Sequence, residues 1–144
     1  MKVVVNEHSV GIGKGLSLKG IKRYLELIGK ECYFYKNTVS NLFCNNDLYK
    51  YELVDISYTD TFPNITVTTE YLGKNTNGLI PKEFCFDIYS INRRDPILIQ
   101  VIEELGNDAN NSRSKFIIKE IPDNINVSWY VRDCNGSEVI ALDL

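Results

Sequence analysis

The chain opens with MKVVVNEHSVGIGKGLSLKGIKRYLELIGKECYFYK, residues 1–36, and this stretch decides the fold class. The apolar run at residues 2–6 predicts a buried strand, and three glycines within five residues then predict a loop. Ser17 is a typical N-cap residue, and apolar side chains recur behind it at helical spacing as far as Gly29. Aromatic side chains at residues 31–36 favour a second strand.

The clearest helix pattern lies in the last third of the chain, where residues 95–106 read DPILIQVIEELG. Asp95 is a candidate N-cap, Pro96 stands at the first helical position, where its missing N–H is harmless, and Gly106 ends the pattern. Three strands are predicted after this helix, at residues 116–121, 127–131 and 139–142. We expect the last two strands to pair as a hairpin about Asn135-Gly136.

The middle of the chain, residues 37–83, has a less regular pattern. The sequence predicts strands at residues 49–58 and 65–72, a polar loop at residues 73–81 and a further strand at residues 84–91. No internal repeat or linker interrupts the chain. We therefore predict a single α+β domain over residues 1–144, with a mixed or antiparallel sheet and two amphipathic helices.

Composition excludes several classes of protein. Among 144 residues, 44% are hydrophobic and 24% are charged, which is typical of a globular protein, and the net charge is -3. An acidic chain provides no overall field that attracts nucleic acid or an anionic membrane, so bulk nucleic acid and membranes are not expected partners. No apolar stretch reaches the length of a membrane span or forms a secretory signal, so we expect a cytoplasmic protein with reduced cysteines.

Metal and cofactor chemistry also lacks a sequence signal. The chain has one histidine, His8, and four cysteines without a C-x-x-C pair, at Cys32, Cys44, Cys85 and Cys134. Metal sites usually need several such ligands at close spacing. We predict neither a metal nor a cofactor.

The glycine loop before the first helix is the first candidate ligand site. Backbone N–H groups at a helix N-terminus attract anions, and glycines let a phosphate approach the backbone closely. The proposed ligand residues in this loop are Gly11, Gly13, Lys14, Gly15 and Ser17. The spacing matches neither a P-loop nor a dinucleotide fingerprint, and a plain connection between strand and helix is the alternative interpretation.

Two arginines directly before the second helix form the other candidate site. Arg93 and Arg94 have the unfavourable sign for a helix N-terminus, and Glu103 and Glu104 have the unfavourable sign for its C-terminus. This helix is therefore expected to use its charges on something other than itself. With the helix N–H groups, the arginines would make a receptor for phosphate or carboxylate, and pairing with acidic residues elsewhere is the alternative.

Evidence for catalysis is weak. Adjacent helical residues point about 100° apart, so Glu103 and Glu104 cannot both face one reacting atom, and no nucleophile elbow is present. The sequence favours a binding protein over an enzyme. Arg113 is a further candidate for phosphate contact, and Tyr89 or Trp129 is a candidate for stacking on a base.

The motifs at both ends of the chain point to a family. The loop V-G-I-G-K-G-L-S, with R-R-D-P-I-L-I-Q-V-I-E-E-L-G-N-D-A-N and I-K-E-I-P-D-N-I-N-V, resembles a group of small tailed-phage proteins with a GGFGLS-like loop and an RxDP…VEELG…EIPD segment. The resemblance covers about the first 36 and the last 55 residues, and Lys14 is extra in the loop. It implies a setting in the cytoplasm of a host cell.

By analogy with small phage counter-defence proteins, we expect a protein that sequesters a phosphorylated, nucleotide-derived immune signal, such as a cyclic ADP-ribose isomer or a cyclic oligonucleotide. A homodimer or larger homo-oligomer is expected, because such proteins often place their sites between protomers. The first alternative is an anti-CRISPR-like inhibitor that binds a host defence protein or nuclease. The second is a small enzyme that processes a nucleotide.

Overall fold

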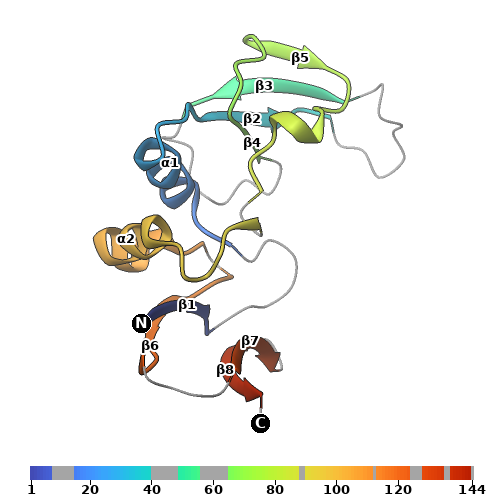
Figure 1. Cartoon of the computed structure of the whole chain (residues 1–144). Helices are drawn as coiled ribbons and strands as arrows, with labels where there is room; N and C mark the ends of the chain where they lie inside the picture. Colours follow the sequence, from blue (N-terminus) through green and yellow to red (C-terminus); the bar gives the residue numbers. More distant parts are fainter. Residues whose placement is uncertain are drawn as a thin grey trace. The chain divides into compact units, whose positions relative to one another are not determined.

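The computed structural model describes residues 1–7, 15–39, 49–55, 65–87, 90–111, 113–123, 128–134 and 137–143. Over these residues the fold is α+β, as predicted, with two α-helices and eight strands in antiparallel sheets (Figure 1). The chain divides into two compact units, residues 1–24 with 88–144 and residues 25–87. The boundary falls within the first helix.

The first unit contains two antiparallel strand pairs and the second helix. Its elements are β1 (Lys2–Asn6), the first two turns of α1 (Leu18–Leu27), α2 (Pro96–Leu105), a short 3-10 helix (Gly106–Ala109), β6 (Phe116–Glu120), β7 (Ser128–Cys134) and β8 (Ser137–Asp143). β1 pairs with β6, and β7 pairs with β8, which confirms the predicted pairing of the last two strands. The Asn135-Gly136 turn itself lies outside the described residues.

The β1–β6 pair forms the centre of the first unit. Val3 and Val5 are fully buried and pack with Ile121 against apolar side chains of the β7–β8 hairpin, namely Trp129, Val131 and Ile140. Val4 is also fully buried, and alternation along a strand directs it to the opposite face. α2 contacts β1 and β6 (Figure 1). A strand buried on both faces explains the VVV run in the sequence.

Both helices begin and end where the sequence predicts. Asp95 caps α2 by accepting a hydrogen bond from the Ile97 backbone N–H (2.8 Å), and Gly106 ends it with a positive φ of 56°. Ser17 caps α1 by accepting a hydrogen bond from the Gly20 N–H (3.0 Å). Gly29 follows with a φ of 75°, a value that glycine adopts readily.

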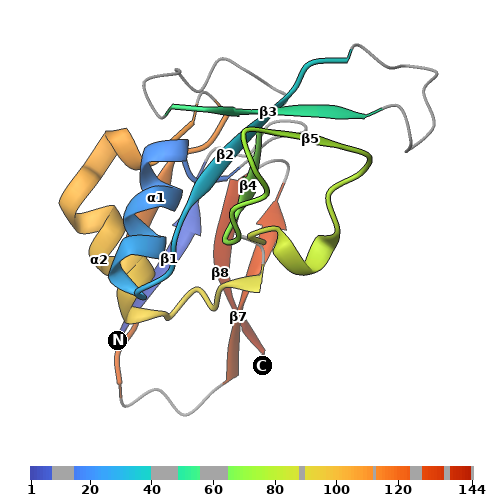
Figure 2. The same cartoon turned by 90° about the horizontal axis from the view of Figure 1, so that it is seen from above.

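The second unit is a four-stranded antiparallel sheet, whose order β4-β2-β3-β5 can be followed in Figure 1 and whose strands are seen from above in Figure 2. Its elements are β2 (Tyr33–Asn37), β3 (Lys50–Val54), β4 (Ile65–Thr68), β5 (Asn75–Asn77) and a 3-10 turn (Lys82–Phe84). Its core contains Tyr35, Tyr51 and Ile80. The buried Tyr35 hydroxyl donates to the Gly73 carbonyl (2.9 Å) and accepts from the Leu72 N–H (2.8 Å), so this aromatic core retains its hydrogen bonds.

Two predictions for the middle of the chain were wrong. The polar loop at residues 73–81 contains the short strand β5, whose Thr76 pairs with Tyr51 of β3. The strand predicted at residues 84–91 is absent from the described part of that range. Instead, Phe84 ends a 3-10 turn and Cys85 makes a single bridge to Thr68 at the edge of β4. The apolar side chains in this segment pack on the tyrosine core without a continuous ladder, which sequence alternation alone does not distinguish from a strand.

Candidate functional site

The glycine loop contributes only its last residues to the described structure. Gly11, Gly13 and Lys14 lie outside the described residues, as do His8 and Tyr89. Gly15 is buried and its carbonyl accepts a hydrogen bond from the Ser114 hydroxyl (2.7 Å).

Ser17 is likewise turned toward the protein itself. It is 2% exposed, and besides capping α1 its hydroxyl donates to the Asp108 carbonyl (2.6 Å). The prediction that Gly15 and Ser17 bind a ligand is therefore corrected. The Ser17 hydroxyl and the Gly15 carbonyl are both used in hydrogen bonds within the protein.

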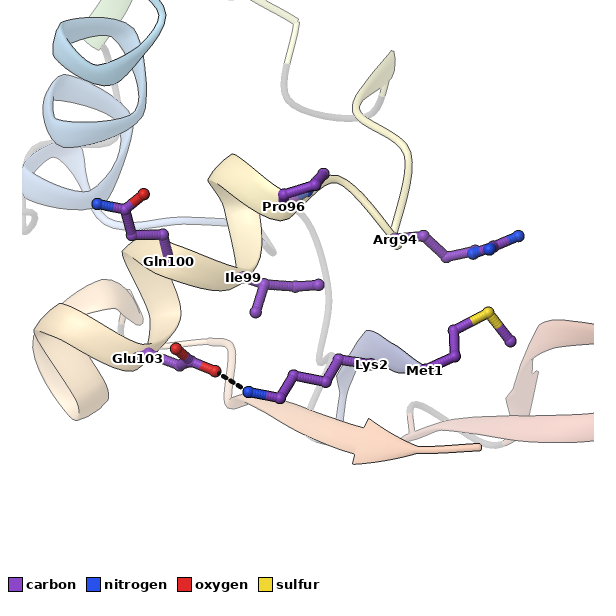
Figure 3. A pocket seen from close by; sticks show the side chains of 7 residues that line it. All are labelled: Met1, Lys2, Arg94, Pro96, Ile99, Gln100 and Glu103. Atoms are coloured by element: carbon purple, nitrogen blue, oxygen red, sulfur yellow. Dashed lines mark hydrogen bonds and ion pairs between the residues drawn. The ribbon is translucent and has the colours of Figure 1, made fainter. Parts of the chain in front are cut away.

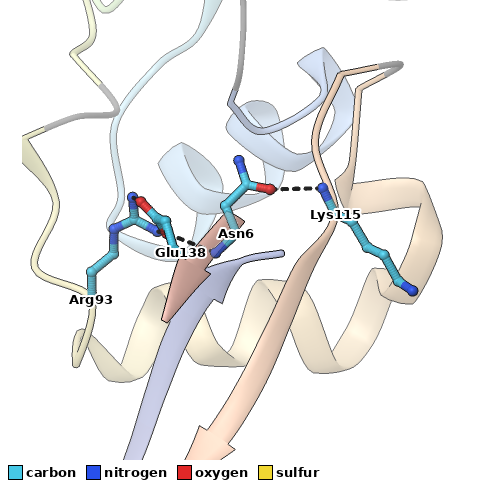
Figure 4. Close-up of polar contacts among 4 residues, drawn as sticks. All are labelled: Asn6, Arg93, Lys115 and Glu138. Carbon is cyan, nitrogen blue, oxygen red and sulfur yellow. Dashed lines mark hydrogen bonds and ion pairs between the residues drawn. The ribbon is translucent and has the colours of Figure 1, made fainter. Parts of the chain in front are cut away.

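Arg93 makes a bidentate ion pair with Glu138 at the start of β8 (Figure 4). Its two terminal nitrogens lie 2.9 and 2.8 Å from the two carboxylate oxygens, and its guanidinium lies over the Phe116 ring at 5.9 Å. The side chains are only 32% and 17% exposed. Such a pair is geometrically specific, and its loss would leave a carboxylate largely withdrawn from water.

The Arg93 contact also joins three segments of the first unit. Glu138 Oε1 accepts a second hydrogen bond from the Asn6 N–H (2.7 Å), and the Arg93 carbonyl accepts one from the Val4 N–H (2.9 Å). The buried Asn6 side chain in turn accepts from the Lys115 N–H (2.8 Å). The Val4 and Asn6 N–H groups thus find partners along the edge of β1 that does not pair with β6. The prediction that Arg93 binds phosphate is corrected, because its guanidinium already has a carboxylate.

Arg94 points elsewhere, although it is the next residue in the chain. Its side chain is exposed, and its guanidinium lies over the Trp129 ring at 5.8 Å from the ring centroid. This distance is within the range of a cation–π contact, which leaves the in-plane N–H groups free to donate. In the described part of the chain, no carboxylate pairs with Arg94. Two residues that the sequence singled out separately are thus brought together.

Arg94 borders a pocket of about 530 Å³ between α2 and the start of β1 (Figure 3). We call it the Arg94 pocket, and it is lined by Met1, Lys2, Arg94, Pro96, Ile99, Gln100 and Glu103. Ile99 and Glu103 are four residues apart and therefore share one face of α2. It is an open hollow on the surface of the first unit rather than an enclosed cavity.

The other charges that border the pocket are already paired. Lys2 Nζ donates to Glu103 Oε1 at 2.6 Å, as the dashed line in Figure 3 shows. This hydrogen bond is the main cause of a raised pKa of Lys2. The Met1 amino group lies 2.9 Å from Asp123 Oδ1. Arg94 is therefore the cation at this pocket that has no acidic partner among the described residues.

The N-terminus of α2 offers little to an anion, contrary to the sequence-based receptor model. Asp95 already places a carboxylate there, and its other oxygen accepts a hydrogen bond from the Tyr24 hydroxyl (2.6 Å). Burial and this hydrogen bond raise the pKa of Tyr24 to about 12. The positive end of the helix is thus satisfied from within the protein.

Glu103 and Glu104 place negative charge at the C-terminal end of α2, where it is unfavourable, and contacts with other side chains compensate for this. Glu104 accepts hydrogen bonds from Arg23 of α1 (2.8 Å) and from Gln100 (2.8 Å), and these contacts lower its pKa. Glu103 pairs with Lys2 of β1. The expectation that this helix uses its charges outside itself is confirmed, and the partners are other parts of the same unit.

Several further features of the site could not be read from the sequence. Lys2 and Glu103 are separated by 101 positions, and no local pattern indicates that they meet. The Glu138 partner of Arg93 carries no motif of its own either. Arg113, a predicted phosphate contact, is exposed in a turn where its backbone N–H donates to Asn111 Oδ1 (2.8 Å), and it does not line the Arg94 pocket.

Other chemistries find little support in the described residues. Within them, no three histidine, cysteine, aspartate or glutamate side chains gather as metal ligands would. Burial raises the pKa of Cys85, which keeps this thiol protonated and weakly nucleophilic at neutral pH. Neither of the two α-helices described combines the length and apolar character needed to cross a membrane.

No protein-family model, no curated protein and no solved structure matches this chain. The likeness to small tailed-phage proteins therefore stays a prediction from the sequence.

Proposed function

We propose that this protein binds a small phosphorylated ligand of nucleotide type, without converting it, in the Arg94 pocket. The observation that carries the proposal is the exposed Arg94 guanidinium, which lies over the Trp129 ring at 5.8 Å and at the rim of a hollow of about 530 Å³. A guanidinium is planar, and its N–H groups match the geometry of a phosphate. A ligand that carries a phosphate and an apolar ring would contact Arg94 at one end and Ile99 and Pro96 along the side of α2.

The side chains that line the pocket favour binding of a ligand over its chemical conversion. The described lining residues are an arginine, an ion pair, an amide and apolar side chains, which supply binding contacts but no evident nucleophile with an activating base. Such a site suits a protein that sequesters its ligand. This is the role that the sequence hypothesis gives to a counter-defence protein.

Native mass spectrometry tests this proposal. The purified protein is exposed to a small-molecule extract from cells with an activated nucleotide-signalling defence and is then measured intact. We expect an added mass that is released unchanged on denaturation and that Arg94→Ala no longer acquires. Arg113→Ala is a matched control, because this exposed arginine does not line the pocket. An unchanged mass in an extract shown to be active would contradict the proposal, and release of an altered compound would indicate an enzyme.

A further inference from the structure

The charges around the Arg94 pocket restrict which phosphorylated ligand it can accept. Arg94, Lys2 and the Met1 amino group supply positive charge, and the last two are paired with Glu103 and Asp123 at 2.6 and 2.9 Å. The pocket therefore retains about one positive charge, at Arg94. A second or third phosphate would find no unpaired cation among the described lining residues.

Besides the lack of a second unpaired cation, the position of Glu103 on α2 would repel a second phosphate. Figure 3 shows Arg94 at one end of the pocket, the Lys2–Glu103 pair at the other, and Ile99 projecting between them. A polyphosphate that extends from Arg94 into the pocket would run toward the Glu103 carboxylate. Lys2 can turn from Glu103 to a phosphate, since both side chains are 47% exposed, but the carboxylate charge stays in place.

We infer that the Arg94 pocket selects ligands with a single, monoanionic phosphate, such as a nucleoside phosphodiester, and that Glu103 determines this selectivity. The inference rests on the proposed function, because it concerns the same pocket. Glu103 is then a specificity residue that disfavours polyphosphates. Apolar contact with Ile99 would make a nucleoside phosphate bind more tightly than free phosphate.

Isothermal titration with four probes tests the inference on the full chain, without divalent cations. The probes are adenosine, 3′,5′-cyclic AMP, AMP and ATP. We expect cyclic AMP to bind about fivefold more tightly than ATP, and adenosine to bind more weakly than cyclic AMP. Glu103→Gln removes the negative charge and frees Lys2, so ATP should bind about fivefold more tightly than it binds to the unchanged protein.

Glu104→Gln is the matched control for this variant. It changes the charge of α2 by the same amount one residue further along, but Glu104 pairs with Arg23 and does not line the pocket. The preference for cyclic AMP over ATP should persist in this control. A circular dichroism spectrum of each variant shows that the fold is retained.

Three results separate the two proposals. In the first, ATP binds to the unchanged protein as tightly as cyclic AMP does, and binding of both is lost in Arg94→Ala. In that case the selectivity inference is wrong, but the proposed function is supported. The selectivity inference is also wrong if Glu103→Gln and Glu104→Gln alter the preference equally. If no probe binds, or if binding persists in Arg94→Ala, the proposed function and the inference both fall.

Discussion

Arg93 and Arg94 are adjacent in the chain, but they lie in two different environments of the first unit. Arg93 is partly buried and holds Glu138 of β8 in a bidentate ion pair, whereas Arg94 is exposed and lies over the Trp129 ring of β7. A turn separates them: the Arg94 N–H donates to Asn92 Oδ1 (2.9 Å) and the Asp95 N–H donates to the Asn92 carbonyl (2.9 Å). Both guanidinium groups lie over an aromatic ring, so the difference between them is the carboxylate: Arg93 has one, and Arg94 has none among the described residues.

The largest expected effect is the loss of Arg93. Arg93→Ala leaves Glu138, whose side chain is 17% exposed, with the Asn6 N–H as its remaining partner among the described residues. We expect the free energy of unfolding to fall by about 2 kcal/mol, less than for a fully buried pair because solvent still reaches Arg93. Urea denaturation measures this value.

Glu138→Ala and the double variant complete a thermodynamic cycle for this pair. Removal of both partners should destabilise the protein less than the sum of the two single changes. Purely additive effects would contradict a direct role of the ion pair.

The second largest effect is expected at Asp95, the residue that follows both arginines. Asp95→Ala deletes the cap of α2 and the acceptor of the Tyr24 hydroxyl. We expect the free energy of unfolding to fall by about 1–2 kcal/mol. Asp95→Asn, which keeps an oxygen at the cap, should recover most of this loss in thermal unfolding. Equal losses in both variants would show that capping is not the main role of Asp95.

The hydrogen bond between Tyr24 and Asp95 also makes stability depend on alkaline pH. The pKa of Tyr24 is about 12 in the folded protein and about 10 in an unfolded chain, so the folded state holds this proton more tightly. Its contribution is complete below about pH 10 and is lost as the pH rises toward about 12.

Tyr24→Phe should therefore reduce the fall in unfolding free energy over this range. Urea denaturation at several alkaline pH values measures the difference between the two proteins. The pKa values of Tyr33 and Tyr51 are also raised, so both proteins keep some pH dependence. Identical slopes would show that the Tyr24 hydroxyl does not retain its proton in the folded state.

How far the sequence could predict these regions depends on whether the deciding contacts are local. The cap at Asp95, the stop at Gly106 and the pairing of the last two strands rest on neighbouring residues, and all were predicted. The Arg93–Glu138 and Lys2–Glu103 pairs join residues 45 and 101 positions apart. Only the unfavourable signs at the two ends of α2 indicated that such partners exist, and signs alone do not identify them.

The candidate site shows the same limit. Arg94 and Trp129 were both singled out in the sequence, but their contact depends on how the β7–β8 hairpin packs on β1. Ser17 illustrates the opposite error, because its position before a helix fits both a cap and an anion site. Burial to 2% exposure and the bond to Asp108 decide for the cap.

The smallest expected effect on stability is that of Arg94. Arg94→Ala removes an exposed cation–π contact, which is worth about 0.5–1 kcal/mol. Thermal unfolding should therefore change much less than in Arg93→Ala. A loss as large as that of Arg93→Ala would show that Arg94 is structural as well, and the contrast between the two arginines would disappear.

The measurement that tests the central claim most directly uses the fluorescence of Trp129, the single tryptophan of the chain. 3′,5′-Cyclic AMP is titrated into the unchanged protein, Arg94→Ala and Arg94→Lys, with excitation selective for tryptophan. We expect a saturable change in emission for the unchanged protein, a weaker response for Arg94→Lys, which keeps the charge but not the planar fork, and none for Arg94→Ala. An emission that stays constant in the unchanged protein, or a response of equal size in Arg94→Ala, would contradict the claim that Arg94 binds the phosphate of a ligand.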